Sequence, residues 1–189
     1  MRWDRLFADM EAQMTAARLR EAELESSELT RAETAEALLQ DRFAGQEGAR
    51  VQVALRGGAT ARGEVARAGS GWVVLDDAGL QILVPLESVL WAEGLGRRRE
   101  SPELRSRLGL GHVVRALAQA RVGVRIHLAD GASGAVLEGT VDRAGRDHLD
   151  LAMHPDDEFR RRRAVRSVRS IPYGAIGCAV SMPGPVSIA

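Results

Sequence analysis

Two stretches of the chain place a hydrophobic residue at every second position. One begins at Val51 with the sequence "VQVALRGG", and the other begins at Val124 with the sequence "VRIHLADG". This alternation is typical of a half-buried strand, and the Gly-Gly or Asp-Gly pair that follows is typical of a tight turn. The sequence therefore predicts a β-hairpin at each of the two places.

The likeness between these two regions continues downstream. The segment "GEVARAGSGWVVLDD" from Gly63 aligns without a gap with "GTVDRAGRDHLDLAM" from Gly139, and "LVPLESV" around Pro85 aligns with "SIPYGAI" around Pro172. Each region therefore predicts a hairpin, a bent strand, another strand, a turn led by proline and a closing strand. Five short strands in this order favour a small closed barrel, which leaves few strand edges open. We interpret the pattern as an internal repeat.

The N-terminal part of the chain has a different pattern, because Ala, Glu, Leu, Arg and Gln dominate from Trp3 to about Phe43 without a Gly or Pro. These residue types favour a helix. Hydrophobic residues recur there at steps of three and four and form a heptad-like seam of Trp3, Phe7, Met10, Met14, Ala17 and Leu24. Such a seam packs either against the protein's own helices and core or against a partner, including a second copy, and both alternatives stay open.

Helix boundaries are indicated at three places. The stretch "ESSELTRAE" contains Ser and Thr residues that compete for local backbone hydrogen bonds, so residues 3–43 form either one helix or two. If there are two helices, the second is expected to end before Gly45 and Gly48. A compact helix is predicted from His112 in "HVVRALAQAR", so that a helix precedes each β-region.

The order "VRIHLADG", "GTVDRAGRDHLDL" and "SIPYGAI" resembles the small barrels of SH3-like and Sm-like proteins. The expected fold class is accordingly α+β, with an N-terminal α-helical region followed by two small SH3-like β-barrels, each preceded by a helix. Sm-like proteins bind RNA through an Asp that is closely followed by Met-Asn. Here Asp147 is followed by His148, Leu149 and Asp150. The RNA-gripping residues therefore do not carry over.

These patterns divide the chain into five parts. A single barrel of this size is short of hydrophobic core, so we expect both barrels and the N-terminal helices to pack as one body. The predicted parts are a helical region (1–47), a first barrel (48–96), an Arg-rich linker with short helices (97–120), a second barrel (121–182) and a tail (183–189).

The whole chain also resembles an uncharacterised protein family of high-GC Gram-positive bacteria, whose members begin much like "MRWDRLFADMEAQ" and contain equivalents of "LGLG" and "IPYGAI". Some members are labelled Fis-family transcriptional regulators, and Fis-type proteins end in a helix-turn-helix. The C-terminus of this chain, "IGCAVSMPGPVSIA", is instead strand-like and rich in proline. It leaves no place for a recognition helix.

Composition narrows the class of protein. Hydrophobic residues make up 45% and aromatic residues only 4%, so the core must consist mainly of Val, Leu, Ile and Ala. Cys178 is the only cysteine, which excludes an intrachain disulfide and a secreted disulfide scaffold. The N-terminus lacks the apolar run of a signal peptide, and no run approaches the roughly 20 residues of a membrane span. We therefore expect a cytoplasmic protein with no membrane partner.

Charge is distributed unevenly, although the formal net charge is zero. All 26 basic residues are Arg; residues 1–48 hold six of them against 11 acidic residues, whereas residues 97–169 hold 16 against ten. Crowded guanidinium groups favour contacts with phosphate, which makes the densest group a candidate anion or nucleic-acid contact. The alternative is a solvated loop that the preceding acidic residues neutralise. This group consists of Arg160, Arg161, Arg162, Arg163, Arg166 and Arg169.

Aromatic residues at strand positions are further candidates. The alternation with Val73 and Leu75 places Trp72 on the outer side of its strand. An indole there either stacks on a base or is covered by a neighbouring helix or barrel. We favour the covered arrangement for Trp72, and likewise for Trp91 and Tyr173.

The sequence gives little support for metal binding or for catalysis. His148, Asp150 and His154 lack a fourth ligand and the spacing of a metal site. The chain also lacks a nucleophile elbow and a phosphate loop. We therefore predict no enzyme activity, no cofactor and no metal.

The expected function is that of a non-enzymatic protein-interaction or structural module. It would bind a protein partner, or a second copy of itself, through the N-terminal seam that contains Trp3, Phe7, Met10 and Met14. The alternative is a nucleic-acid-binding protein that uses the Arg-rich segment around Arg160–Arg163.

Overall fold

The structure is a computed structural model of the 189-residue chain, of which residues 37–100, 107–130, 135–153 and 167–182 are described. The chain divides into two units, residues 1–38 and residues 39–189. The first unit lies outside the described residues except for its last two positions. The part of the predicted helical segment 3–43 that covers residues 3–36 therefore stays a prediction. The fold described below is that of the second unit.

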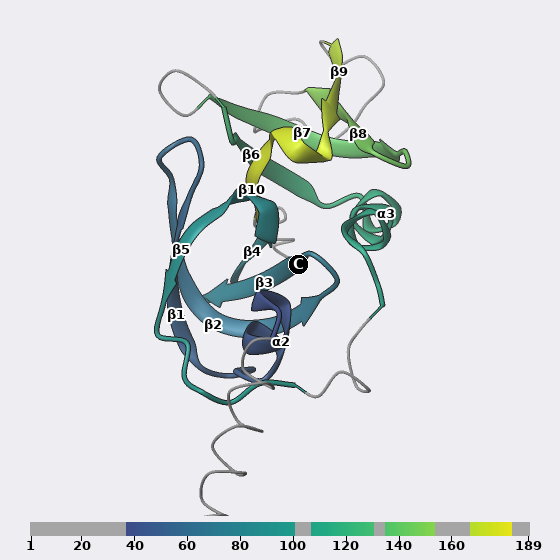
Figure 1. The fold of residues 1–189 in the computed structure, drawn as a ribbon. Coiled ribbons are helices and arrows are strands. Elements are labelled where there is room, and N and C mark those ends of the chain that lie inside the picture. The colour runs from purple at the N-terminus through teal and green to yellow at the C-terminus, as the bar shows by residue number, and fades with distance from the viewer. Residues whose placement is uncertain (1–36, 101–106, 131–134, 154–166, 183–189) are drawn as a thin grey trace, which may run out of the picture. The chain divides into compact units, whose positions relative to one another are not determined.

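Ten strands and two short α-helices make up the described residues (Figure 1). Strands β1–β5 form what we call the first half, and strands β6–β10 the second half. The first half contains β1 (Arg50–Leu55), β2 (Thr60–Gly69), β3 (Trp72–Asp77), β4 (Leu80–Pro85) and β5 (Val89–Glu93). The second half contains β6 (Gly123–Leu128), β7 (Val136–Ala144), β8 (His148–Met153), β9 (Ser167–Pro172) and β10 (Ile176–Ser181).

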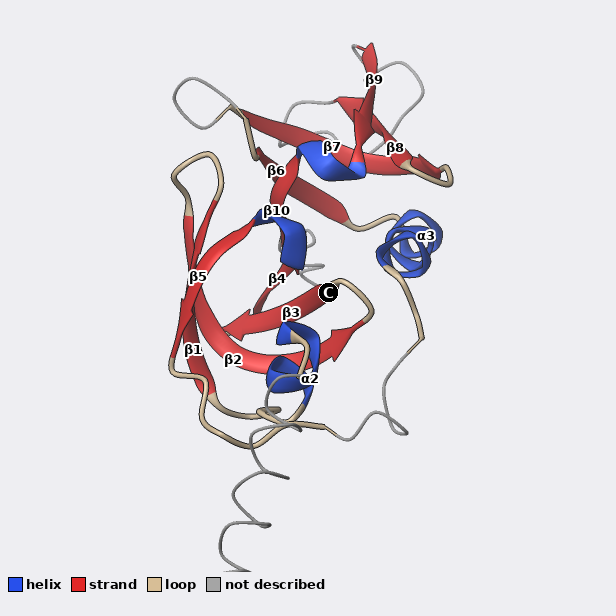
Figure 2. Ribbon diagram, viewed as in Figure 1, coloured by secondary structure: helices blue, strands red, loops and turns tan. Residues whose placement is uncertain are grey.

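Helices occupy corresponding places in the two halves (Figure 2). Helix α2 (Leu39–Ala44) precedes β1, and helix α3 (Leu110–Ala120) precedes β6. One-turn 3-10 helices, η1 (Leu86–Ser88) and η2 (Tyr173–Ala175), follow the prolines that end β4 and β9. The predicted helix end before Gly45 and the predicted helix around His112 are both confirmed. No helix in the described ranges is long and apolar enough to cross a membrane.

The hydrophobic alternation has the predicted effect in both halves. Val51, Val53 and Leu55 are buried while the residues between them are partly exposed. The hairpin from β1 to β2 closes through Gly57 and Gly58, whose φ angles of 81° and 83° belong to the left-handed region that glycine adopts without strain. Strands β6 and β7 pair in the same antiparallel way. Both predicted hairpins are therefore present.

The two halves also have the same strand order. It is β5-β1-β2-β3-β4 in the first half and β10-β6-β7-β8-β9 in the second. The register shifts between Val65 and Arg67 in the first half and between Val141 and Arg143 in the second. Because a bulge bends its strand, β2 and β7 are curved at corresponding positions.

The predicted fold class of two small closed barrels behind an N-terminal helical region is wrong. All ten strands form one open antiparallel sheet, because β10 pairs with β6 on one side and with β4 on the other. Ala179 lies opposite Leu83, and Val180 lies opposite Ile82. Alternation within a strand identifies the strand but does not specify which edge lies beside it. The pairing of β4 with β10 satisfies backbone groups along one edge of each of these two strands.

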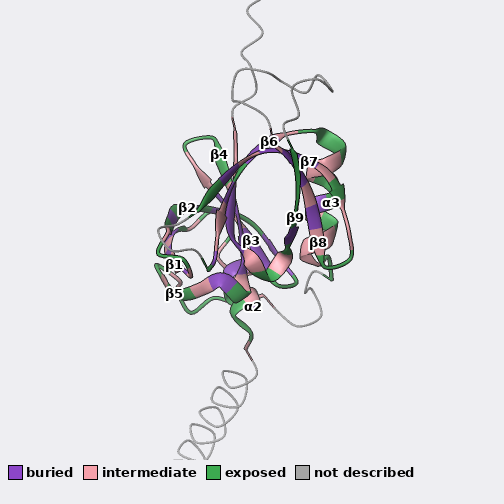
Figure 3. Cartoon of the chain, turned by 90° about the horizontal axis from the view of Figure 1, so that it is seen from above, coloured by how far each residue is buried: buried purple, intermediate pink, exposed green. Residues whose placement is uncertain are grey.

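Each half has a hydrophobic cluster, and the two clusters exchange members where β4 meets β10. We call this contact between the halves the internal joint. Figure 3 shows that the buried positions lie mainly on the strands. The first-half cluster includes Phe43 of α2, Val53, Leu55 and Leu75, together with Cys178 of β10. The second-half cluster includes Val114 of α3, Ile126 and Leu151, together with Trp72 and Leu83 of the first half.

At two positions the backbone of the facing strand is too close for any residue other than glycine. A Cβ at Gly63 would collide with the carbonyl oxygen of Asp76, and a Cβ at Gly139 would collide with the carbonyl oxygen of Ala152. Only glycine therefore allows β2 to lie against β3, and β7 against β8, at this distance.

Candidate functional site

The internal joint is held by backbone pairing and by side chains from both halves. The Ser88 hydroxyl lies 2.7 Å from the carbonyl oxygen of Gly177 and donates a hydrogen bond to it. Arg56 Nη2 lies 2.9 Å from a carboxylate oxygen of Asp130. Because Ser88 is buried, its hydrogen bond forms in a place that water does not reach.

The joint leaves β5 and β9 as the two ends of the sheet. The direction of the β5 backbone follows from its pairing with β1. The Leu55 N–H donates to Ala59 and therefore points toward β2, and by alternation the Val53 N–H does the same. Ala92 lies opposite Val53. The N–H and C=O groups of Ala92 consequently point away from β1, toward the open edge.

The same reasoning gives the direction of the β9 backbone. The Tyr173 N–H donates to the carbonyl oxygen of Asp147 at 2.8 Å, which fixes the phase of the hydrogen bonds between β8 and β9. Ser170 lies opposite Asp150, three residues before Tyr173 on the β9 side. The N–H and C=O groups of Ser170 therefore point away from β8. Both open edges thus present backbone groups that no described strand satisfies.

Side chains at the two edges are apolar and charged. Leu90 is 63% exposed and Trp91 is 49% exposed on β5, and Val168 is 55% exposed on β9. Glu93 at the end of β5 and Arg169 on β9 are exposed, and within the described ranges neither has an ion-pair partner. Exposed apolar side chains beside unpaired strand groups are the features of a surface that accepts another strand.

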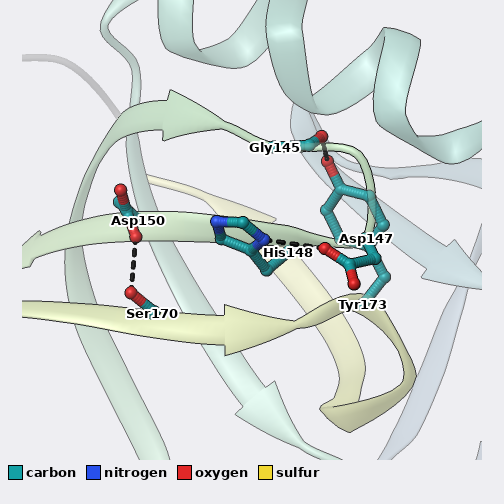
Figure 4. A network of polar contacts seen from close by, with 6 residues as sticks. All are labelled: Gly145, Asp147, His148, Asp150, Ser170 and Tyr173. Atoms are coloured by element: carbon teal, nitrogen blue, oxygen red, sulfur yellow. Dashed lines mark hydrogen bonds and ion pairs between the residues drawn. The ribbon is translucent and has the colours of Figure 1, made fainter.

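Polar side chains lie on the outer face of β8 and β9 (Figure 4). His148 Nδ1 lies 2.8 Å from Asp147 Oδ1, and this hydrogen bond raises the pKa of His148 and lowers the pKa of Asp147. The Ser170 hydroxyl donates to Asp150 at 2.6 Å. The Tyr173 hydroxyl donates to the carbonyl oxygen of Gly145 at 3.0 Å. Gly145 and Asp147 lie in the turn between β7 and β8, and Tyr173 lies in η2, so these polar groups bond to one another along β8 and β9 and in the segments next to them.

The aromatic candidates have different surroundings. Trp72 is only 3% exposed, and its Nε1 donates to the carbonyl oxygen of Leu108 at 2.7 Å, so the prediction that it is covered is confirmed. Tyr173 is half-buried. Trp91 is exposed on β5, so the same prediction is wrong for Trp91. The reason is that no described strand lies beyond β5.

Most of the other predicted site residues lie outside the described ranges. Arg169 is described and exposed, whereas Arg160–Arg163 and Arg166 are not described. The seam residues Trp3, Phe7, Met10 and Met14 are not described either. The nucleic-acid contact and the helical seam therefore stay predictions. His148 and Asp150 belong to no group of three or more metal-ligating side chains within the described ranges, and His154 lies outside them.

The strand β5 was predicted as the closing strand of the first region, but its position at an open edge of the sheet was missed by reasoning from the sequence. The segment "VLWAE" nevertheless carries a signal, because Leu90 and Trp91 are consecutive large apolar residues and one of them must point away from the core. The register between β1 and β5 shifts at this point.

Comparison with known proteins finds no matching family model and no similar curated protein. The resemblance to a bacterial protein family therefore remains a prediction from the sequence.

Proposed function

We propose that this chain is a non-enzymatic cytoplasmic interaction module, which binds another polypeptide by strand addition at an open edge of its sheet. The observation that carries the proposal is the edge of β5. There the backbone groups of Ala92 point outward, beside the exposed side chains of Leu90 and Trp91. An added strand would pair with Ala92 and cover both side chains.

The composition of β5 supports this function. Strands that avoid partners carry several charges, a proline or a covering loop, whereas Glu93 is the only charged residue of β5. Complete burial of a large apolar side chain contributes about 1.5–3 kcal/mol. Leu90 and Trp91 would supply part of that amount each, because each is already partly covered. Covering β5 therefore provides a driving force for binding.

Photo-crosslinking in the cells that make the protein tests the proposal. Benzoylphenylalanine in place of Leu90 should form adducts with protein, whereas the same group in place of Arg62, an exposed residue on the internal strand β2, should not. The change Ala92→Pro should abolish the adducts at position 90, because it removes the outward N–H and leaves the hydrogen bonds to β1 intact. Equal adducts at both positions, or none at position 90, would contradict the proposal.

Binding of nucleic acid is a second candidate function. The observation in its favour is the exposed guanidinium group of Arg169, at the described end of the Arg-rich segment. Replacing Arg160–Arg163 by Ser should then reduce retention on immobilised DNA and flatten its salt dependence, by about 0.9 in the logarithmic slope for each phosphate contact that is lost. Unchanged elution at every salt concentration would eliminate this candidate.

A further inference from the structure

We propose that copies of this chain join head to tail, with β5 of one copy pairing with β9 of the next. This inference rests on the proposed function and names the partner at the open edges as a second copy of the chain. The internal joint supplies the geometry, because it is already a contact between the last strand of one half and the fourth strand of the other. The two open strands are the counterparts of the two strands in that joint.

The correspondence between β5 and β10 follows from their bulges. Val89 and Trp91 pair with β1 around the skipped residue Leu90, just as Ile176 and Cys178 pair with β6 around a skipped Gly177. Ala92 therefore corresponds to Ala179, and Glu93 corresponds to Val180.

The correspondence between β9 and β4 follows from their final prolines. Pro172 and Pro85 each end their strand and precede a 3-10 turn. Counting back from them, Ser170 corresponds to Leu83, and Arg169 corresponds to Ile82. The pairs of the internal joint, Ala179 with Leu83 and Val180 with Ile82, then predict two pairs between copies. These are Ala92 with Ser170 and Glu93 with Arg169.

The backbone directions match this register. Ala92 and Ser170 each point their N–H and C=O groups toward the open edge. Placed opposite each other on antiparallel strands, they would exchange two hydrogen bonds without disturbing the pairing with β1 or β8. If the register between the two copies shifted by one residue, backbone groups that already point toward β1 or β8 would lie at the contact. The register taken from the internal joint is thus the one that the free backbone groups allow.

The charges match the same register. Glu93 and Arg169 would occupy a pair without backbone hydrogen bonds, where cross-strand side chains come closest. Pairing β5 with another β5 would place two Glu93 side chains on one short ladder, and pairing β9 with another β9 would place two Arg169 side chains there. Like charges on facing strands are destabilising. The two edges therefore favour each other and disfavour themselves.

Side chains at this contact differ from those at the internal joint, and the loss of an ion pair makes the contact the weaker of the two. Trp91 takes the place of the buried Cys178 and would be covered by the second half of the next copy. The ion pair between Arg56 and Asp130 has no counterpart, because Ala129 and Gly57 hold the corresponding positions. The contact between copies should therefore be reversible and should weaken as salt is added.

Disulfide trapping between differently sized copies tests the pairing. One full-length chain carries Glu93→Cys and a second, longer tagged chain carries Arg169→Cys. In the predicted register the Cα atoms of such a pair lie about 4.5 Å apart, within the roughly 4.4–6.8 Å that a disulfide spans. The native Cys178 should not interfere, since it is buried and its burial raises its pKa to about 11. The control pairs Arg169→Cys with Arg62→Cys on β2.

The expected result is a mixed disulfide in the Glu93→Cys and Arg169→Cys mixture, at least ten times more abundant than in the control mixture or in either chain oxidised alone. Equal yields in all samples, or no mixed disulfide, would overturn the head-to-tail pairing. Photo-adducts at position 90 with a different protein, together with a negative trapping result, would overturn the pairing and leave the proposed function in place. Absence of both signals would overturn the two proposals together.

Discussion

Trp72 and His148 occupy corresponding positions in the two halves but have opposite surroundings. Each is the first residue of its strand, and each ring lies against a glycine, Gly69 or Gly145, that has no room for a Cβ. Trp72 is 3% exposed because it packs into the second-half cluster, whereas the His148 side chain is 44% exposed. The same strand position is apolar where the internal joint covers it and polar where nothing described covers it.

Neighbouring positions repeat this difference between the halves. Val74 and Leu83 on the covered face correspond to Asp150 and Ser170 on the open face, where the Ser170 hydroxyl donates to Asp150. Permanent contacts are more apolar than contacts that form and dissociate. The internal joint is therefore a fixed part of the fold, and the open edge is suited to a partner that binds and leaves.

The largest expected effects come from core changes that test whether the two halves unfold together. Leu75→Ala in the first half and Leu151→Ala in the second should each lower the free energy of unfolding by about 2–5 kcal/mol, since both side chains are fully buried. Urea denaturation should show one transition for each variant, because the two clusters share members across the joint. Two separate transitions would show that the halves fold independently.

The close backbone approaches should be the next most sensitive positions. Gly63→Ala and Gly139→Ala should each cost about 1–3 kcal/mol, because the added Cβ forces the backbone of the facing strand to move. Gly174→Ala is the matched control, since a Cβ there meets only one atom, at 3.7 Å. Thermal unfolding measures all three. A control as unstable as the two test variants would refute the role assigned to the close approach.

A smaller effect is expected when Trp72 and its counterpart His148 are replaced and the losses in the free energy of unfolding are compared. Trp72→Phe removes the hydrogen bond to Leu108 and should cost about 0.5–1.5 kcal/mol from that bond. His148→Gln should change stability by about 0.5 kcal/mol or less, because the side chain is largely exposed. Denaturation of the two variants under identical conditions measures the difference. Equal losses in the free energy of unfolding would mean that Trp72 and His148 are buried to the same extent.

The smallest expected effect is on histidine titration. The hydrogen bond with Asp147 raises the pKa of His148, whereas burial and then Arg125 lower the pKa of His127, so an NMR titration should place the two on opposite sides of 6.5. The stabilisation from His148 is complete below its unfolded pKa and is lost as the pH rises through its folded pKa. Asp147→Asn should lower the pKa of His148 and leave His127 unchanged. If the pKa of His148 does not change in this variant, the hydrogen bond between His148 and Asp147 is excluded.

The strands could be predicted from the sequence because their signals are local. The alternation of Val51, Val53 and Leu55 determines a strand whatever lies beside it. The pairing of β10 with β4 could not be predicted, since Ala179 and Val180 have the same sequence pattern whether their outer edge is open or occupied. The error of two closed barrels arose at these residues.

The candidate site was only partly accessible to reasoning from the sequence. Trp72 lies on the internal strand β3 and Trp91 on the edge strand β5, and only the segments packed against each residue decide that one is buried and the other exposed. The opposite charges of Glu93 and Arg169 are visible in the sequence, but their correspondence requires the register of the internal joint. The predictions for Arg160–Arg163 and for Trp3 concern residues outside the described ranges.

Light scattering on charge-reversed variants tests the central claim most directly. The full-length chain should have a mass above that of one copy, and the excess should fall as the protein is diluted. Glu93→Arg alone and Arg169→Glu alone should each reduce the mass toward that of one copy, because each places like charges at the contact. An equimolar mixture of the two variants should restore the mass, since every contact in it again joins opposite charges. A mass of one copy for the unmodified chain at every concentration, or variants that remain separate when mixed, would contradict the account.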